Sequence, residues 1–334
     1  MNQLRAALIG CGKMGSEYSS DIQQSGVYSH AHAYSAHPAT ELVAVCDADP
    51  RRAKACADQW GVPAHFDDYR EMLAVAKPDI VSICTPDETH FKIGMNVLEA
   101  EGVRGVICEK PLALDVCRAR QMAQSASAHE VALLVNYSRR FDAAYQTLRC
   151  QIQKGCLGSI QAVSGYYGKG LLHNGSHWLD LLRFMFGEVR WVIGKPTDWA
   201  FGDDPTCDVW FGMESGFTAF LHGTDSEMYT VFEMDILGSS GRVKISKTGR
   251  SLEYYEAQDS PVVAGYRELS DEPYLTVNAM SEAILGAVDN MVSHLQEGAA
   301  LACSGSDAVE TLALVEAVRA SALTGECVSM KALR

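Results

Sequence analysis

A glycine turn directly after an apolar run constrains the fold of this chain more than any other feature. The run Leu4–Ile9 leads straight into Gly10-Cys11-Gly12-Lys13-Met14-Gly15. Glycines at these three positions allow a tight turn, a close approach of the backbone to a pyrophosphate, and close packing of a helix on the strand. The following helix N-terminus would face the phosphates. The pattern predicts a dinucleotide-binding turn, with all six residues in the cofactor site.

The first part of the chain alternates short apolar runs with helix-like stretches. The runs lack clean polar alternation, which is typical of strands covered on both faces. They are Leu4–Ile9, Glu41–Cys46, Asp79–Cys84, Val103–Cys108 and Val131–Val135. The helix-like stretches are Arg51–Gln59, Tyr69–Ala76, His90–Glu101 and Asp115–His129. We therefore predict an α/β protein whose residues 1–136 form a Rossmann domain with a doubly wound parallel sheet.

From residue 137 the pattern changes to alternating strands. The expected strands are Ile160–Tyr167, Val189–Ile193, Thr206–Met213, Phe217–Gly223, Val231–Leu237, Arg242–Ser246 and Ser251–Glu256, and the expected helices are Phe141–Lys154, Thr276–Glu297 and Ser306–Leu323. We predict a second α/β domain over residues 137–334 with a large, mostly antiparallel open sheet. One face would be buried and the other available to a partner. The last helices would pack back toward the Rossmann domain.

Composition narrows the classes of partner and compartment. The 334 residues carry a net charge of −14, which argues against nucleic acid or an anionic membrane surface as a partner. The eleven cysteines include no C-x-x-C pair, so we expect reduced thiols rather than disulfides or a zinc cluster. No apolar run is long enough to span a membrane, and the first expected strand leaves no room for a signal peptide. We expect a cytoplasmic protein.

Asp47 is the candidate ribose-binding residue, because it ends the second expected strand. A carboxylate there can accept hydrogen bonds from the ribose hydroxyls and repel a 2′-phosphate, which favours NAD over NADP. The alternative is that Asp47 caps the next helix, although Asp49 could take that role. The segment from Gly15 to Asp47 is longer than the usual spacing of about 20 residues. We place the excess in an insertion over residues 18–28, whose role is open.

Further motifs come in a fixed order along the chain. They are Val43-Ala44-Val45-Cys46-Asp47, Thr85-Pro86 with His90, Glu109-Lys110-Pro111, Arg140-Phe141, Gly175-Ser176-His177-Trp178-Leu179-Asp180 and Val315-Glu316-Ala317. With the glycine turn, this order resembles the glucose–fructose oxidoreductase / inositol dehydrogenase / MocA family over nearly the whole chain. The resemblance implies an NAD(P)-dependent oxidoreductase acting on sugars, sugar derivatives or cyclitols. It also implies a homodimer or homotetramer formed through the second domain's sheet.

Further cofactor contacts are expected at the ends of the third and fourth strands. Thr85 and Pro86 follow the third strand and would contact the nicotinamide half, although a simple strand-ending turn explains them equally well. His90, Glu109 and Lys110 belong to the same set, and Glu109 would be a positioning partner rather than a base. Pro111 would fix the turn after the fourth strand through a cis peptide bond.

Lys110 is the first candidate catalytic residue. An ammonium at a strand end beside the nicotinamide can hydrogen-bond a substrate hydroxyl and stabilise a developing alkoxide. Partial desolvation would bring its pKa toward the range needed for proton transfer. The alternative is a surface lysine at a turn.

His177 is the second catalytic candidate, and His173 is a departure from the family. His177 matches the family's histidine, a general acid–base or substrate-orienting group, and Asp180 could orient it or bind substrate. A structural histidine is the alternative. His173 stands where relatives usually have an aspartate, so the proton relay is rewired, the substrate carries an anionic group, or the catalytic role is lost.

A metal site is an alternative at the same place. His173, His177 and Asp180 have the spacing of ligands on one helical face. However, Asn174-Gly175-Ser176 is typical of a helix start, which would leave His173 out of register, so we expect no metal. The remaining candidate substrate-binding residues are Tyr137, Arg140, Tyr167, Lys169 and Asn174.

Three functions are consistent with these observations. The first is an NAD-dependent dehydrogenase that transfers hydride between nicotinamide and a secondary hydroxyl or ketone of a sugar, amino sugar, nucleotide sugar or cyclitol. The second is a dinucleotide-binding sensor without turnover. The third is glycoside cleavage with an internally recycled NAD.

Overall fold

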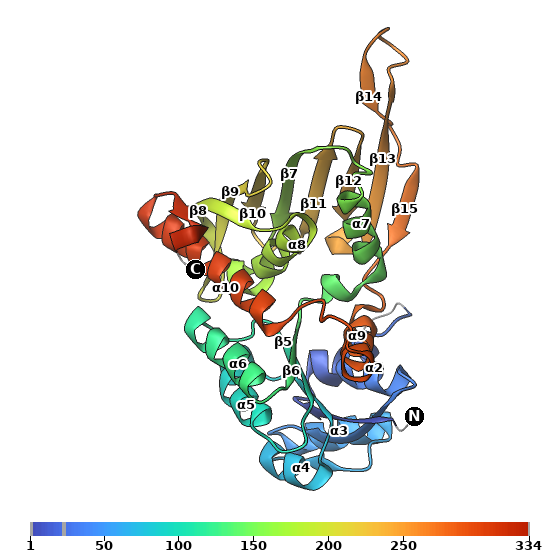
Figure 1. Cartoon of the computed structure of the whole chain (residues 1–334), viewed down its shortest axis with the longest axis vertical. Coiled ribbons are helices and arrows are strands. Elements are labelled where there is room, and N and C mark those ends of the chain that lie inside the picture. Colours follow the sequence, from blue (N-terminus) through green and yellow to red (C-terminus); the bar gives the residue numbers. More distant parts are fainter. Residues whose placement is uncertain (1–2, 22–24, 333–334) are drawn as a thin grey trace. The chain divides into compact units, whose positions relative to one another are not determined.

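The computed structural model of the chain describes residues 3–21 and 25–332, and it divides into two compact units (Figure 1). Unit 1 consists of Met1–Asp142 and Ser281–Glu310, and unit 2 of Ala143–Met280 and Thr311–Arg334. Part of the predicted insertion over residues 18–28, residues 22–24, lies outside the described residues. Each unit has its own sheet and its own buried apolar side chains.

Unit 1 is built on a six-stranded sheet in the order β3-β2-β1-β4-β5-β6. All neighbouring strands are parallel. The strands are β1 (Leu4–Ile9), β2 (Thr40–Cys46), β3 (His65–Phe66), β4 (Ile80–Ile83), β5 (Gly105–Glu109) and β6 (Ala132–Asn136). This is the strand order of a Rossmann fold, which confirms the predicted doubly wound sheet. The order reverses between β1 and β4, so the carboxyl ends of these two strands mark the expected ligand crevice.

Some helices of unit 1 begin at residues whose side chains cap them. They are η1 (Lys13–Glu17), α1 (Tyr18–Asp21), α2 (His30–Ala36), α3 (Pro50–Trp60), α4 (Tyr69–Ala76), η2 (Asp87–Thr89), α5 (His90–Leu98), α6 (Val116–Ala128), η3 (Ser138–Phe141) and α9 (Ala283–Glu297). Asp49 and Asp68 cap α3 and α4 by accepting from backbone N–H groups of the first turn. Helix α2 was not predicted, although Ser29 caps it in the same way.

Unit 2 contains a ten-stranded sheet in the order β14-β13-β12-β11-β7-β10-β9-β8-β16, with β15 paired to β13. Its strands are β7 (Ile160–Tyr167), β8 (Val189–Phe201), β9 (Asp204–Met213), β10 (Thr218–Gly223), β11 (Phe232–Gly238), β12 (Gly241–Ser246), β13 (Ser251–Asp259), β14 (Arg267–Leu269), β15 (Leu275–Asn278) and β16 (Val328–Ser329). Except for β7 with β10, the strand pairs described are antiparallel. The predicted mostly antiparallel sheet is therefore confirmed.

Helices cover one face of this sheet. They include α7 (Ala143–Gln153) and α8 (Ser176–Phe186), preceded by η4 (Gly170–Gly175). Trp178 of α8 stacks on Phe211 of β9 at a centroid distance of 5.8 Å, and its indole N–H donates to the Glu233 carbonyl. The remaining helical segments are η5 (Lys247–Gly249), η6 (Met330–Ala332) and α10 (Gly305–Thr324), whose residues are divided between the two units.

The predicted helix Thr276–Glu297 is wrong in its first part. Helix α9 starts at Ala283, and Thr276 instead lies in β15, opposite Glu253 of β13. Pairing with a neighbouring strand outweighs the local pattern here. No helix among the described residues is long and apolar enough to cross a membrane.

Candidate cofactor and catalytic site

The three glycines of the turn after β1 have three different surroundings. Gly10 has φ +94°, and a Cβ there would lie 2.5 Å from the Cys84 carbonyl oxygen. A Cβ at Gly15 would lie 2.0 Å from the Gly10 carbonyl oxygen. A Cβ at Gly12 would meet no heavy atom within 4 Å. Gly10 and Gly15 are therefore needed for packing, whereas Gly12 leaves open space for a close-lying ligand, as a dinucleotide pyrophosphate requires.

Asp47 ties the end of β2 to this turn. Its carboxylate accepts from the backbone N–H of Cys11 at 2.8 Å and from that of Asp49 at 2.9 Å. Because Asp49 itself caps α3, the structure decides against Asp47 as that cap. Each carboxylate oxygen of Asp47 keeps a further lone pair, which suits a ribose hydroxyl. The residues present therefore fit a dinucleotide.

His90 joins the loops that follow β4 and β5. Its two ring nitrogens lie 2.8 Å from the Thr85 carbonyl oxygen and 2.7 Å from the Pro111 carbonyl oxygen. The Thr89 hydroxyl donates to the Pro86 carbonyl at 2.7 Å. The imidazole is fully buried, so its role in the structure is to hold the two loops that carry the predicted nicotinamide contacts.

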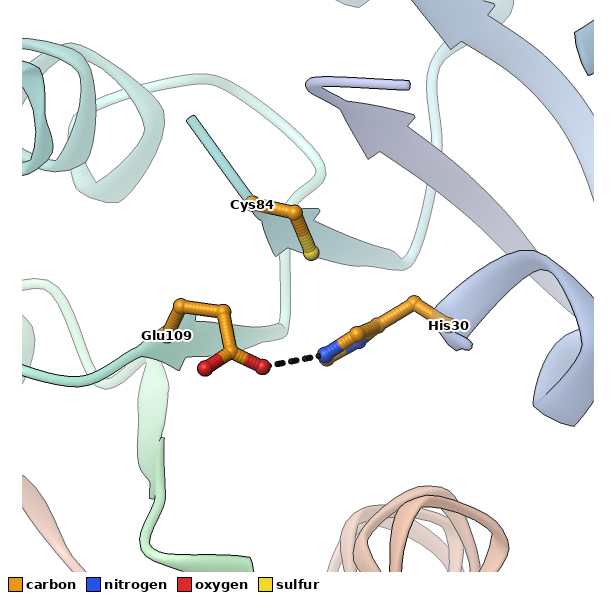
Figure 2. A group of neighbouring side chains, drawn as sticks. All are labelled: His30, Cys84 and Glu109. Atoms are coloured by element: carbon orange, nitrogen blue, oxygen red, sulfur yellow. Dashed lines mark hydrogen bonds and ion pairs between the residues drawn. The ribbon is translucent and has the colours of Figure 1, made fainter. Parts of the chain in front are cut away.

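Glu109, at the end of β5, is a buried carboxylate with two hydrogen-bond donors. His30 Nε2 lies 2.9 Å from Glu109 Oε1, and Asn136 Nδ2 donates to the same oxygen at 2.7 Å (Figure 2). Burial by itself would raise the pKa of Glu109, but these hydrogen bonds and the nearby charges of His30 and Lys110 outweigh it and hold the pKa below its ordinary value. Glu109 therefore carries a negative charge at neutral pH.

Lys110 directly follows this carboxylate, and its peptide bond to Pro111 is cis, as the sequence predicted. The charge of Lys110 acts on two carboxyl groups of unit 1, Glu109 and Asp87. Burial dominates at Asp87 and raises its pKa, although Lys110 and His90 work in the opposite direction. The Lys110 ammonium group after β5 thus interacts electrostatically with the carboxyl groups of Glu109 and Asp87.

In unit 2 the predicted histidines lie on either side of a helix start. His173 is an exposed residue of η4, whereas His177 is the second residue of α8 and half-buried. The predicted helix start at Asn174-Gly175-Ser176 is confirmed, since α8 begins at Ser176. The His173 ring packs against Phe201 at a centroid distance of 5.0 Å.

Asp204 of β9 holds the turn that carries His173. Its carboxylate accepts from the backbone N–H groups of Leu172 and His173 at 2.8 and 2.9 Å, and it pairs with Arg319 of α10 at 2.8 Å. Asn174 Nδ2 and Ser176 Oγ, next to the two histidines, are buried without a hydrogen-bond partner among the described residues. Such groups call for a ligand or water oxygen, which supports Asn174 as a substrate-binding candidate.

Several predicted substrate-binding side chains already have partners within their own unit. The Tyr167 hydroxyl donates to the Cys207 carbonyl and accepts from the Cys207 N–H. Arg140 is buried and pairs with Asp307 at 3.2 Å. Asp180 is buried and accepts from Thr311 at 3.0 Å. Tyr137 is also buried. Burial and these partners within the protein suit structural roles as well, and the part of the four residues in substrate binding stays a prediction.

Lys169 differs from these residues. It is half-buried, has φ 62°, and immediately precedes η4, the turn that carries His173. It keeps its place among the candidate substrate-binding residues.

Sequence reasoning missed His30, Asn136 and Asp204. Asn136 could have been found, because it directly follows the expected strand Val131–Val135, and in the structure it pairs with Glu109 of the neighbouring parallel strand. His30 and Asp204 gave no local signal, since their partners are distant in sequence, as the pair of His30 with Glu109 shows.

Two family models match the chain, one on each side of its middle. The model described as "Oxidoreductase family, NAD-binding Rossmann fold" matches residues 4–137. The model described as "Oxidoreductase family, C-terminal alpha/beta domain" matches residues 166–330. The first match covers the glycine turn, Asp47 and Lys110, and the second covers His173 and His177.

Curated relatives and solved structures agree with these matches. The chain is 26% identical to D-apiose dehydrogenase of Paraburkholderia graminis, over 100% of this chain and 91% of that protein. It is 27% identical to inositol 2-dehydrogenase of Rhizobium meliloti, over 94% of this chain and 95% of that protein. A structure of levoglucosan dehydrogenase in complex with NADH and L-sorbose has a TM-score of 0.81 at 19% identity, covering 99% of both chains. This last likeness concerns the fold alone.

Proposed function

Since this chain belongs to the glucose–fructose oxidoreductase / inositol dehydrogenase / MocA family of NAD-binding oxidoreductases, we propose that it oxidises a secondary hydroxyl of a sugar, amino sugar, nucleotide sugar or cyclitol, or reduces the corresponding ketone. The observation that carries the proposal is the open space at Gly12 in the turn after β1, combined with Lys110 directly after β5 of the same sheet. The names of the apiose and inositol dehydrogenases support the substrate class.

The proposed cofactor contacts come from the residues of unit 1. The turn Gly10–Gly15 holds the pyrophosphate, Asp47 accepts from the adenosine ribose, and Thr85, Pro86 and His90 shape the nicotinamide end. When bound, NAD supplies the acceptor or donor of a hydride. A carboxylate at Asp47 disfavours the 2′-phosphate of NADP.

The proposed proton chemistry uses Lys110 and His177. In the oxidative direction the substrate carbon loses a hydride while its hydroxyl oxygen loses a proton. Lys110 stabilises the developing alkoxide through its ammonium group, and His177 accepts the proton. In the reductive direction the same groups return the proton to the new hydroxyl. Asn174, with its buried unpartnered amide, and Lys169 bind further substrate oxygens.

The test is a turnover screen with matched variants. NAD⁺ reduction is followed with a panel of neutral sugars, cyclitols, sugar acids and nucleotide sugars, for the wild type, Lys110→Met, His177→Asn and the exposed control Lys154→Met. We expect turnover of at least one substrate class by the wild type and Lys154→Met, and its loss in the other two. NADH binding without turnover across the panel would contradict the proposal and favour a sensor. Product formation without net NAD⁺ reduction would favour internally recycled NAD.

His173 is tested in the same screen. If this residue replaces the family's aspartate because the substrate is anionic, sugar acids or nucleotide sugars are the preferred class, and His173→Asp lowers their turnover. If the proton relay is rewired instead, His173→Asp changes the turnover of neutral substrates. If neither His173→Asp nor the wild type turns over any substrate of the panel, the catalytic role of this site is lost.

We also propose that the chain forms a homodimer or homotetramer through the sheet of unit 2. The face of this sheet away from α8 carries two aromatic pairs: Tyr166 stacks on His222 at a centroid distance of 5.5 Å, and Trp191 meets Trp210 edge to face at 5.5 Å. Tyr166 and Trp210 are nearly half exposed. Light scattering of the wild type and Trp210→Glu tests this, and a monomeric wild type would contradict it.

The eleven free thiols support a reducing compartment such as the cytoplasm.

A further inference from the structure

His30 of α2 is a buried histidine that the proposed reaction does not use. Its exposed fraction is 0%, and both ring nitrogens have partners on different strands. Nδ1 lies 2.9 Å from Ser82 Oγ on β4, and Nε2 lies 2.9 Å from Glu109 Oε1 on β5. The Tyr34 hydroxyl, one turn further along α2, lies 2.7 Å from Ser82 Oγ. We call Tyr34, Ser82, His30, Glu109 and Asn136 the His30 network.

The chemistry of the partners fixes the direction of the hydrogen bonds. A carboxylate only accepts, so Nε2 of His30 carries a hydrogen and donates to Glu109. If the imidazole is neutral, it accepts at Nδ1 from the Ser82 hydroxyl, and Ser82 accepts from the Tyr34 hydroxyl. In this arrangement every donor of the chain from Tyr34 to Glu109 is satisfied without water.

This network controls a single carboxylate oxygen. His30 and Asn136 both donate to Glu109 Oε1, from two different elements, α2 and β6. Two donors on one oxygen restrict the rotamer of the side chain and favour its charged form, in spite of its burial. Asn136 Oδ1 is buried and has no partner among the described residues, so the network also presents one unused acceptor.

A metal centre is the competing explanation. His30, Cys84 and Glu109 offer ligand atoms that lie within 4.8 Å of one another, and Figure 2 shows the Cys84 thiol directed toward the other two side chains. However, a metal would have to replace the hydrogen bond between His30 and Glu109. Burial, helped by the charge of Glu109, also raises the pKa of the Cys84 thiol well above its ordinary value, so it stays protonated. The hydrogen-bonded arrangement is therefore favoured.

We propose that His30 is a positioning residue, which keeps Glu109 ionised and fixed beside Lys110 and thereby sets the acidic limit of the pH range in which Lys110 works. The link to Lys110 rests on the function proposed above, whereas the control of Glu109 by His30 does not. Four other titratable groups interact electrostatically with Glu109: Lys110, Asp87 of η2, Cys84 after β4 and Cys108 of β5. His90 of α5 acts on Asp87. His30 donates a hydrogen bond directly to the carboxylate.

The direct test is the ionisation of Glu109 itself. The side-chain carboxyl carbons are labelled with ¹³C, and the Glu109 signal is assigned by its absence in Glu109→Gln. In the wild type we expect the Glu109 signal to retain the chemical shift of an ionised carboxylate down to a lower pH than the signal of an exposed glutamate does. In His30→Leu, which has no donor, its titration is expected to move up by about one pH unit or more. In His30→Gln, whose amide can still donate, it is expected to stay near the wild type.

Controls and a functional arm complete the experiment. His129→Gln replaces an exposed histidine at the end of α6 and should leave the Glu109 titration unchanged. If His30→Leu does not fold, Ser82→Ala and His30→Gln carry the comparison, with Ser82→Ala expected to shift the titration upward by a smaller amount. The pH dependence of kcat/KM on the best substrate of the screen should have its acidic limit moved to higher pH in His30→Leu, in step with Glu109.

The outcomes separate this inference from the proposed function. An equal Glu109 titration in wild type and His30→Leu overturns the inference, whether or not a substrate is turned over. One equivalent of bound zinc or magnesium in the purified protein, lost in Cys84→Ala, also overturns it in favour of a metal centre. If the Glu109 titration is shifted in His30→Leu but the wild type turns over no substrate, the result supports the role of His30 and contradicts only the proposed dehydrogenase activity.

Discussion

At the scale of single residues, Gly12 and Gly15 separate cofactor binding from folding. Gly15→Ala places a Cβ 2.0 Å from the Gly10 carbonyl oxygen, a backbone atom that cannot move away cheaply. We expect a loss of about 2 kcal/mol or more in the free energy of unfolding. Gly12→Ala meets no protein atom within 4 Å and should change this free energy by less than about 0.5 kcal/mol. It should instead weaken NADH binding at least tenfold.

Urea unfolding and NADH fluorescence titration of both variants check this contrast. Equal destabilisation by the two alanines, or full NADH affinity in Gly12→Ala, would speak against the assigned turn. These glycines could be placed correctly from the sequence because the three-glycine spacing has a single structural meaning after a strand.

His30 shows the limit of residue-level prediction. The histidine lies just after the predicted insertion over residues 18–28, and no neighbouring residue points to its role. Its partners Ser82 and Glu109 lie 52 and 79 positions away. Only the parallel pairing of β4 with β5, and the packing of α2 against the sheet, bring them together. A contact of this kind depends on the tertiary fold and has no local pattern.

At the scale of elements, the strands of unit 1 were the easiest to predict. β1 has the predicted bounds, and β2, β4, β5 and β6 differ by one or two residues at their ends. Their continuous apolar runs leave no other way to bury so much surface. Helix α2 and strand β15 were missed. The first depends on a single capping serine, and the second exists only because β13 offers a neighbour.

Asp204 is the residue by which β9 fixes the turn before α8. Asp204→Ala removes the acceptor for two backbone N–H groups and leaves Arg319 without its carboxylate. We expect a loss of about 2 kcal/mol in the free energy of unfolding, and at least a tenfold fall in kcat/KM through displaced His173 and His177. Asp203→Ala, at an exposed neighbouring position, serves as the control. Unchanged kcat/KM in folded Asp204→Ala would show that this turn does not serve the reaction.

The ion pair of Arg140 with Asp307 predicts a pH-dependent contribution to stability. Burial opposes ionisation of Asp307, but Arg140 and Ser304 outweigh it and lower its pKa. A carboxyl group whose pKa is lower in the folded than in the unfolded state stabilises the folded protein at pH values above its unfolded pKa of about 4. This stabilisation is lost as the pH falls through the pKa of the folded state. Asp307→Asn should therefore destabilise by about 3 kcal/mol at pH 7, because Arg140 stays buried.

Unfolding measured at several pH values decides this prediction. The difference between wild type and Asp307→Asn should shrink below about pH 4, where the wild type also loses the charge. A difference that is constant with pH would show that the pair contributes no charge interaction to stability.

At the scale of the whole molecule, cofactor binding should stabilise the folded chain. A ligand at a hundred times its Kd adds about 2.7 kcal/mol to the free energy of unfolding. NADH at this excess should raise the Tm by a few degrees, and the rise should be absent in Gly12→Ala. NADPH should raise it less, because Asp47 disfavours the 2′-phosphate. A larger rise with NADPH would contradict the role given to Asp47.

The change in sequence pattern indicated two domains, but it gave no physical reason for the return of α9 to unit 1. This helix comes after the strands of unit 2 in sequence, yet its residues belong to the compact unit that contains the Rossmann sheet. Gly286, where a Cβ would lie 2.2 Å from the Phe141 carbonyl oxygen, shows how closely it packs there. Periodicity describes which face of a helix is apolar, but it does not say which sheet that face covers.

The proposed dehydrogenase reaction depends above all on Lys110, which must take part in the chemistry and not in folding or cofactor binding alone. The turnover number of Lys110→Met and of the wild type on the best substrate of the screen, with the NADH Kd of both, decides this point. We expect a turnover number at least 100-fold lower in the variant, as for the loss of a general acid–base or charge-stabilising group, with a Kd within about tenfold. A Lys110→Met protein that keeps wild-type turnover would contradict the proposed role of Lys110.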